Sequence, residues 1–115
     1  MQIGSFVAPS GYTLAVTGKV ICEELKIQAT PWADYVFQSD YKLKSFDELR
    51  SFIQTNHHLP GIPDAKTVEE NGIELGDMQI RMMEKIEELT LYILQLEEKQ
   101  VSLQHEIDLL KTAQH

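Results

Sequence analysis

The chain has 115 residues, with 10 basic and 18 acidic side chains and a formal net charge of −8 at pH 7. This length is typical of one domain, and the negative charge disfavours binding to nucleic acid or to an anionic membrane. No apolar run is long enough to span a bilayer, and the N-terminal sequence MQIGSFVAPSG lacks the pattern of a signal peptide. The lone Cys22 excludes an intrachain disulfide.

Residues 1–31 are predicted to be a β-rich segment. YTLAV and KVICEELKI contain the Val, Ile, Leu and Tyr residues that favour strands, and the turn pair Thr17-Gly18 lies between them. Two strands alone do not form a stable sheet, so their open edges require partners from the middle of the chain or from other copies of it.

Residues 32–72 are predicted to be a small α+β unit that contains a short strand, DYVF, and a helix from Phe46 to about Asn56. The helix start is marked by Ser45 as N-cap with Glu48 three residues on, which is a capping box. The prolines and glycine of HHLPGIPDA end this helix. AKTVEENG then predicts one or two helical turns that end at Asn71-Gly72.

Residues 73–115 are predicted to form one long helix. From Leu75 onward, apolar residues recur at alternating steps of four and three, which is the heptad pattern of a coiled coil. The rest of the chain is too small to cover this helix, and no second heptad segment is present, so identical copies are the expected partners. The predicted interface comprises Met82, Ile86, Leu89, Ile93, Leu96, Gln100, Leu103, Ile107 and Leu110.

Two features of the heptads favour different numbers of helices. With isoleucine at the a positions and leucine at the d positions, the seam favours a parallel dimer. The flanking e and g positions offer few oppositely charged pairs, which suits the wider contact of three helices, and we expect a parallel trimer. Those positions are Met83, Lys85, Thr90, Tyr92, Glu97, Lys99, Gln104, Glu106 and Lys111.

Other residues of the long helix are expected to set its register and to contact the middle unit. Gln79 and Gln100 occupy a positions, where polar residues pair across the axis and fix the register at some cost in stability. Ile80 and Leu91 lie off the seam, and we expect the middle unit to dock on them.

Four stretches of the chain carry a resemblance to a known type of domain. They are GYTLAVTGKVICEELKI, ADYVFQSDYKLKSFDEL, HHLPGIPDAKTVEENGIELGDM and KIEELTLYILQLEEK. The order of elements resembles the C-terminal intramolecular-chaperone domain of endosialidase-type phage tail spikes and tail fibres. The stretches are also similar to the C-terminal ends of fibre-like surface proteins of Bacteroidetes and their phages. The resemblance implies a homotrimer, with residues 1–31 at the end of a fibre, in a virion tail or at a bacterial surface.

The same resemblance implies a candidate cleavage site in SDYKLK. In many chaperone relatives the matching serine attacks its own preceding peptide bond and a lysine activates it, and Ser39 and Lys44 have that spacing. A lysine serves as the base only when burial or nearby positive charge lowers its pKa. Asp40, Asp47 and Glu48 are close in sequence and favour the charged lysine, so we expect an intact chain and no enzyme activity. A self-cleaving chaperone is the alternative.

A third hypothesis is an adhesive fibre tip, in which Trp32, Tyr35 and Tyr41 bind a cell-surface glycan or receptor. His57 and His58 have no further ligands at metal-binding spacing, so we expect no metal and no cofactor. One group of acidic residues is expected to form a solvated helix face: Glu84, Glu87, Glu88, Glu97 and Glu98.

These observations predict an α+β fold with a short N-terminal β segment, a small α+β middle and a long C-terminal helix in a parallel trimeric coiled coil. The expected function is homotrimerisation and chain registration at the C-terminus of a tail-fibre-like or cell-surface fibrous protein.

Overall fold

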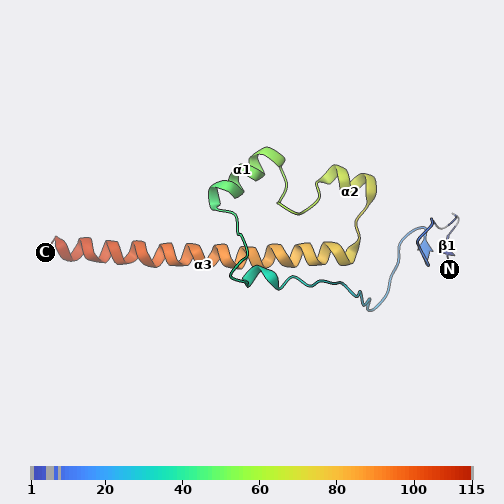
Figure 1. Ribbon diagram of the computed structural model, residues 1–115, viewed down its shortest axis with the longest axis horizontal. Helices are drawn as coiled ribbons and strands as arrows, with labels where there is room; N and C mark the ends of the chain where they lie inside the picture. Colours follow the sequence, from blue (N-terminus) through green and yellow to red (C-terminus); the bar gives the residue numbers. More distant parts are fainter. Residues whose placement is uncertain (1, 5–6, 8, 115) are drawn as a thin grey trace.

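The computed structural model describes residues 2–4, 7 and 9–114, so residues 1, 5, 6 and 8 of the predicted β-rich segment lie outside the described residues. The chain is mostly helical (Figure 1). Its elements are β1 (Gln2–Ile3), β2 (Ala15–Val16), the 3-10 helix η1 (Tyr35–Phe37), α1 (Phe46–Asn56), α2 (Ala65–Asn71) and α3 (Leu75–Ala113).

The long helix α3 determines the shape of the molecule. Its 39 residues span about 58 Å at a rise of 1.5 Å per residue. The chain extends over 80 × 31 × 29 Å, with a radius of gyration of 22.1 Å, whereas a compact chain of this length has about 13 Å. Because the molecule is extended, its core is small. Among the described apolar residues, Ala33, Val36 and Tyr92 are buried.

Helix α1 begins and ends as its local sequence predicts. The Ser45 hydroxyl accepts a hydrogen bond from the Glu48 N–H at 3.1 Å, and the Glu48 carboxylate accepts one from the Ser45 N–H at 3.3 Å. This reciprocal pair satisfies N–H groups that the helix itself leaves unpaired. The helix ends at His57, whose backbone adopts the left-handed conformation with φ 59°.

The predicted helical turns of AKTVEENG are confirmed as α2. The Asp64 carboxylate caps this helix by accepting a hydrogen bond from the Thr67 N–H at 3.0 Å. Gly72 ends it with φ 70°, a conformation that costs glycine little because it has no Cβ. The chain then reverses directly into α3 at Leu75.

The N-terminal strands are shorter than the sequence predicts, and one of the two predicted strands does not form. Strand β1 pairs in parallel with β2, with Gln2 opposite Ala15 and Ile3 opposite Val16. Residues 19–27, which include KVICEELKI, contain no strand. A ladder this short gives little stability, and Val20 and Ile21 remain exposed because no layer covers them.

The predicted strand DYVF is also wrong, because Tyr35–Phe37 form the 3-10 helix η1. Val36 lies within this helix, and Ala33 lies two residues before it. Both side chains are buried, and η1 contacts α3. Packing against α3 therefore outweighs the strand preference of these residues.

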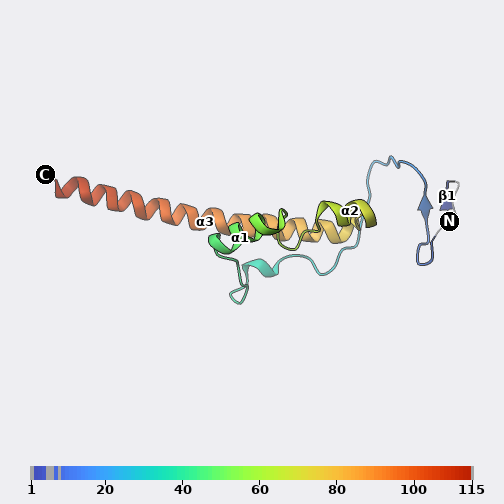
Figure 2. The ribbon, with the colours of Figure 1, turned by 90° about the horizontal axis from the view of Figure 1, so that it is seen from above.

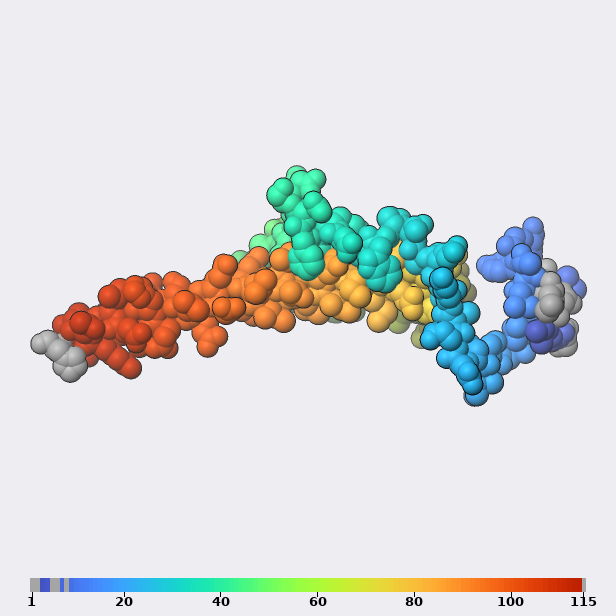
Figure 3. All heavy atoms as spheres, turned by 90° about the horizontal axis from the view of Figure 1, so that it is seen from below, coloured from blue at the N-terminus to red at the C-terminus, as the bar shows by residue number. Residues whose placement is uncertain are grey.

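Two segments of the chain lie along different sides of helix α3. We call residues 27–37 the arm and residues 46–71 the helical layer. Figures 1 and 2 show that the arm runs along a different side of α3 from α1 and α2. Figure 3 shows that the C-terminal part of α3 projects beyond both. The β1–β2 pair lies at the opposite end of the molecule (Figure 1).

Candidate functional site

The heptad seam of α3 is exposed along its whole length. The apolar residues of the predicted interface, from Met82 to Leu110, keep between 44% and 64% of their surface exposed. Gln79 and Gln100, predicted to set the register, are exposed as well. The described part of the chain therefore leaves a continuous apolar stripe about half exposed, as the heptad pattern predicts for a helix whose partners are other chains.

A second face of α3, in its N-terminal half, is covered through polar contacts. The Tyr35 hydroxyl donates a hydrogen bond to the Glu84 carboxylate, and the Tyr41 hydroxyl donates one to the Glu88 carboxylate. The hydrogen bond to Glu84 raises the pKa of Tyr35 to about 12. Burial, followed by the hydrogen bond to Glu88, raises the pKa of Tyr41.

Lys85 and Tyr92 complete this covered face. The Lys85 ammonium lies 3.2 Å from the Glu84 carboxylate and 2.8 Å from that of Glu88. The Tyr92 hydroxyl donates a 2.8 Å hydrogen bond to the Lys44 carbonyl, and its ring centroid lies 5.2 Å from that of Phe46. The two contacts of Tyr92 hold the start of α1 against α3.

Ile80 and Leu91, which were predicted to contact the middle unit, are half-buried. Several residues that make the contacts described above were not predicted to do so. Glu84 and Glu88 were expected in a solvated face, but both bind tyrosine hydroxyls. Glu87, expected in the same face, is only 8% exposed. The spacing of four residues between Glu84, Glu88 and Tyr92 was the available signal, since it aligns them on one side of a helix.

Glu87 is the least satisfied polar group of this face. One of its carboxylate oxygens, Oε2, is buried and has no hydrogen-bond partner among the described residues. Burial, followed by the negative charges of Asp34 and Glu84, raises the pKa of the Glu87 carboxyl. The charged form of this side chain therefore opposes the contact between η1 and α3.

Two flanking residues of the seam have partners within their own chain. Tyr92 at a g position is buried by the helical layer, and Met83 at an e position lines a groove with Trp32. These contacts within one chain therefore explain why Tyr92 and Met83 are uncharged, without a third helix. Thr90 and Gln104 are the exposed flanking residues that still favour three helices over two.

The candidate cleavage residues occupy separate environments. Ser39 is exposed in the turn after η1. The Lys44 ammonium lies 5.7 Å from the centroid of the Phe52 ring. The described hydrogen bonds do not join the Ser39 hydroxyl to Lys44. The charge of Lys44 lowers the pKa of Glu48, after the larger effect of the Ser45 hydrogen bonds, so a carboxylate lies within electrostatic reach of this lysine.

The aromatic residues proposed for glycan binding are not equivalent. The hydroxyls of Tyr35 and Tyr41 are bound to α3, and their rings lie 5.9 Å apart. Trp32 is 47% exposed beside Gln79, Met82, Met83 and Ile86. Trp32 is therefore the member of this group that offers a free ring surface, and it lies next to the seam.

The histidines and the cysteine have ordinary surroundings. His57 ends α1, and the His58 ring packs edge-on against Phe52 at 5.5 Å. Cys22 is exposed and free. Within residues 2–4, 7 and 9–114, no group of three or more His, Cys, Asp and Glu side chains has the geometry of a metal site.

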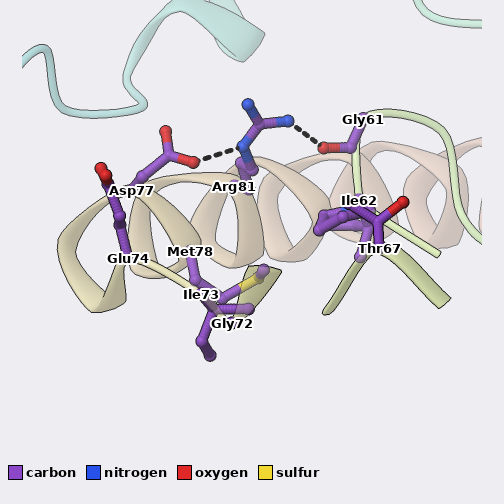
Figure 4. A pocket seen from close by; sticks show the side chains of 10 residues that line it. Gly61, Ile62, Thr67, Gly72, Ile73, Glu74, Asp77, Met78 and Arg81 are labelled. Carbon is purple, nitrogen blue, oxygen red and sulfur yellow. Dashed lines mark hydrogen bonds and ion pairs between the residues drawn. The ribbon is translucent and has the colours of Figure 1, made fainter. Parts of the chain in front are cut away.

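A cavity of about 430 Å³ lies between the helical layer and the first turns of α3 (Figure 4). The Arg81 guanidinium crosses its wall, where it pairs with the Asp77 carboxylate at 2.8 Å and donates a hydrogen bond to the Gly61 carbonyl. The apolar part of the lining consists of Ile62, Pro63, Ile73 and Met78.

Comparisons with known proteins assign no family to the chain, because no family model, curated protein or solved structure matches it. The resemblance to tail-fibre chaperone domains is therefore a prediction from the sequence. No helix in the described residues has the length and hydropathy needed to cross a bilayer.

Proposed function

We propose that this chain is a homotrimerisation and chain-registration module of a tail-fibre-like or cell-surface fibrous protein. The observation that carries the proposal is the exposed heptad seam of α3, which runs from Met82 to Leu110 and is bordered by the helical layer near Leu89. A stripe of this length is unfavourable in water and matches itself in other copies.

Burial of the seam supplies a driving force of useful size. Each of its large apolar side chains is about half exposed, and burying the remaining half gives roughly 1 kcal/mol per side chain. The gain accumulates over the eight apolar side chains of the seam in every chain, and it exceeds the lower estimates of the cost of association, about 4 kcal/mol.

The proposed trimer is parallel and in register. Parallel packing brings Gln79 and Gln100 level with their symmetry mates, where the amide groups can pair with each other. An antiparallel or shifted arrangement opposes these amides to apolar side chains and leaves them unsatisfied. Three helices suit the uncharged Thr90 and Gln104 at the flanks, although the isoleucine and leucine pattern by itself favours two.

The molar mass of the full chain in solution tests the proposal. Light scattering is expected to give about three times the chain mass of 13.2 kDa. Leu89→Asp and Ile93→Asp should each dissociate the assembly, because each puts charges on the axis without partners. Glu98→Gln is the matched control, because it changes an exposed residue off the seam and should leave the mass unchanged.

Each outcome of this measurement has a definite meaning. A monomeric parent chain contradicts the proposal as a whole. A dimer contradicts the trimer and shows that the pattern at the a and d positions outweighs the flanking residues. Dissociation of the Glu98→Gln variant would show that the assembly uses a face of α3 other than the seam.

A further inference from the structure

The arm and the helical layer lie along opposite flanks of the seam. In the heptad numbering that puts Ile86 at an a position, Met83 is an e residue, and Trp32 of the arm lies beside it. Tyr92 is a g residue; its ring packs on Phe46 at the start of the helical layer, and its hydroxyl binds the Lys44 carbonyl just before that layer. The e flank of each α3 therefore carries the arm, and the g flank carries the helical layer.

Parallel coiled coils bring these two flanks together. The e residues of one helix face the g residues of its neighbour, and each g residue faces the e residue of the following heptad. Met78 is the g residue that precedes Met83 in this register. Met78 of one copy therefore faces Met83 of the next copy, beside which Trp32 is packed.

The two surfaces that face each other at Met78 and Met83 each contain a hollow. On the g flank, Met78 lines the cavity of about 430 Å³ shown in Figure 4. On the e flank, Trp32 borders a groove of about 300 Å³ together with Met82 and Met83. Trp32 is 47% exposed, so a large aromatic surface lies free opposite the cavity.

The cavity has the chemistry that an indole ring requires. Ile62, Ile73 and Met78 supply apolar contact. The Arg81 guanidinium is held in place by the Asp77 carboxylate and the Gly61 carbonyl, and a fixed guanidinium stacks on an aromatic face. The Glu74 carboxylate at the rim can accept a hydrogen bond from the indole N–H, the polar group that a buried tryptophan must satisfy.

We propose that Trp32 of each copy packs against the cavity beside Met78 of the next copy, so that arm and helical layer interlock around the trimer. This inference rests on the proposed function, since it needs parallel copies joined along the seam. It adds a contact that the seam alone does not provide. The contact specifies parallel orientation, because in an antiparallel pair the arm would not face the helical layer.

Fluorescence quenching in mixed assemblies tests this contact. Trp32 is the single tryptophan of the chain, so its emission reports on one site. Full-length chains carrying Cys22→Ser, Trp32→Phe and Met78→Cys are labelled with a nitroxide at position 78. An excess of these chains is then unfolded and refolded together with Cys22→Ser chains that retain Trp32.

The expected result is loss of most of the Trp32 emission, because the nitroxide of one chain lies against the tryptophan of another. A nitroxide at Glu98→Cys is the matched control, and it should leave the emission unchanged because position 98 lies far along α3. A short bismaleimide cross-linker provides a second measurement. It should join Trp32→Cys to Met78→Cys between chains, and so produce covalent dimers and trimers on a denaturing gel.

The two proposals fail in distinguishable ways. Unquenched emission and the absence of interchain cross-links, in samples whose light scattering still gives a trimer, overturn the Trp32 contact and leave the trimer standing. A monomeric mass for the unlabelled Cys22→Ser chain overturns the proposed function and the contact with it. Quenching that is equal at positions 78 and 98 also overturns the contact, because it shows no preference for the cavity.

Discussion

Removal of the Tyr92 side chain should detach the helical layer from α3. The residue is 7% exposed, its hydroxyl donates a 2.8 Å hydrogen bond to the Lys44 carbonyl, and its ring packs on Phe46 at 5.2 Å. Tyr92→Phe removes only the hydroxyl and should lower the free energy of unfolding by about 1 kcal/mol. Tyr92→Ala also removes the ring, and for a buried aromatic residue the cost is about 3–5 kcal/mol.

Urea titrations followed by near-ultraviolet circular dichroism measure both losses, with all samples at one chain concentration because unfolding of an oligomer depends on it. Tyr12→Phe is the matched control, since Tyr12 is 65% exposed and should tolerate the change. The molar mass should stay that of the parent because the seam is untouched. A loss below about 1 kcal/mol for Tyr92→Ala would contradict the described docking of α1 on α3.

Three further predictions concern other parts of the chain. The free energy of unfolding should rise as the pH falls from 7 toward 4.5, the usual pKa of a glutamate, because the pKa of Glu87 is raised in the folded chain and protonation removes an unfavourable buried charge. Glu87→Gln should flatten this part of a plot of melting temperature against pH. The parent chain should keep its intact mass after purification, and Ser39→Ala should match it in mass and melting temperature; fragments that vanish in Ser39→Ala would establish self-cleavage. Truncation after Lys85 should leave the N-terminal residues poorly ordered, because their strands are too short to be stable alone; a well-dispersed monomeric NMR spectrum would contradict this.

The helices could be predicted from the sequence because their signals are local or periodic. The hydroxyl of Ser45 and the carboxylate of Glu48 mark the start of α1 within four residues, and Gly72 marks the end of α2. The heptad pattern extends over most of α3 and leaves little doubt about its length. The exposed seam follows from the same pattern, so the main feature of the candidate site was predictable.

The remaining features depend on contacts between distant residues. Val36 prefers strands by type, but burial against α3 selects a 3-10 turn instead. Glu84 and Glu88 were expected to face solvent, and the tyrosines that bind them lie 49 and 47 residues earlier in the chain. The spacing within one helix shows that such residues share a side, but it does not identify the segment that covers that side.

The exposed C-terminal part of α3 has a consequence for the order in which the proposed trimer forms. Every described residue from Ile93 to Gln114 is exposed, and this part of α3 lacks the packing that gives helices in proteins most of their stability. In dilute chains the backbone amides of this end should exchange with solvent quickly, while those near Tyr92 are protected by packing. In the proposed trimer, the contacts of this part with other copies need no folding of the N-terminal half, so this part of α3 should associate first. Protection from hydrogen exchange should then spread along α3 from its C-terminus as the chain concentration rises.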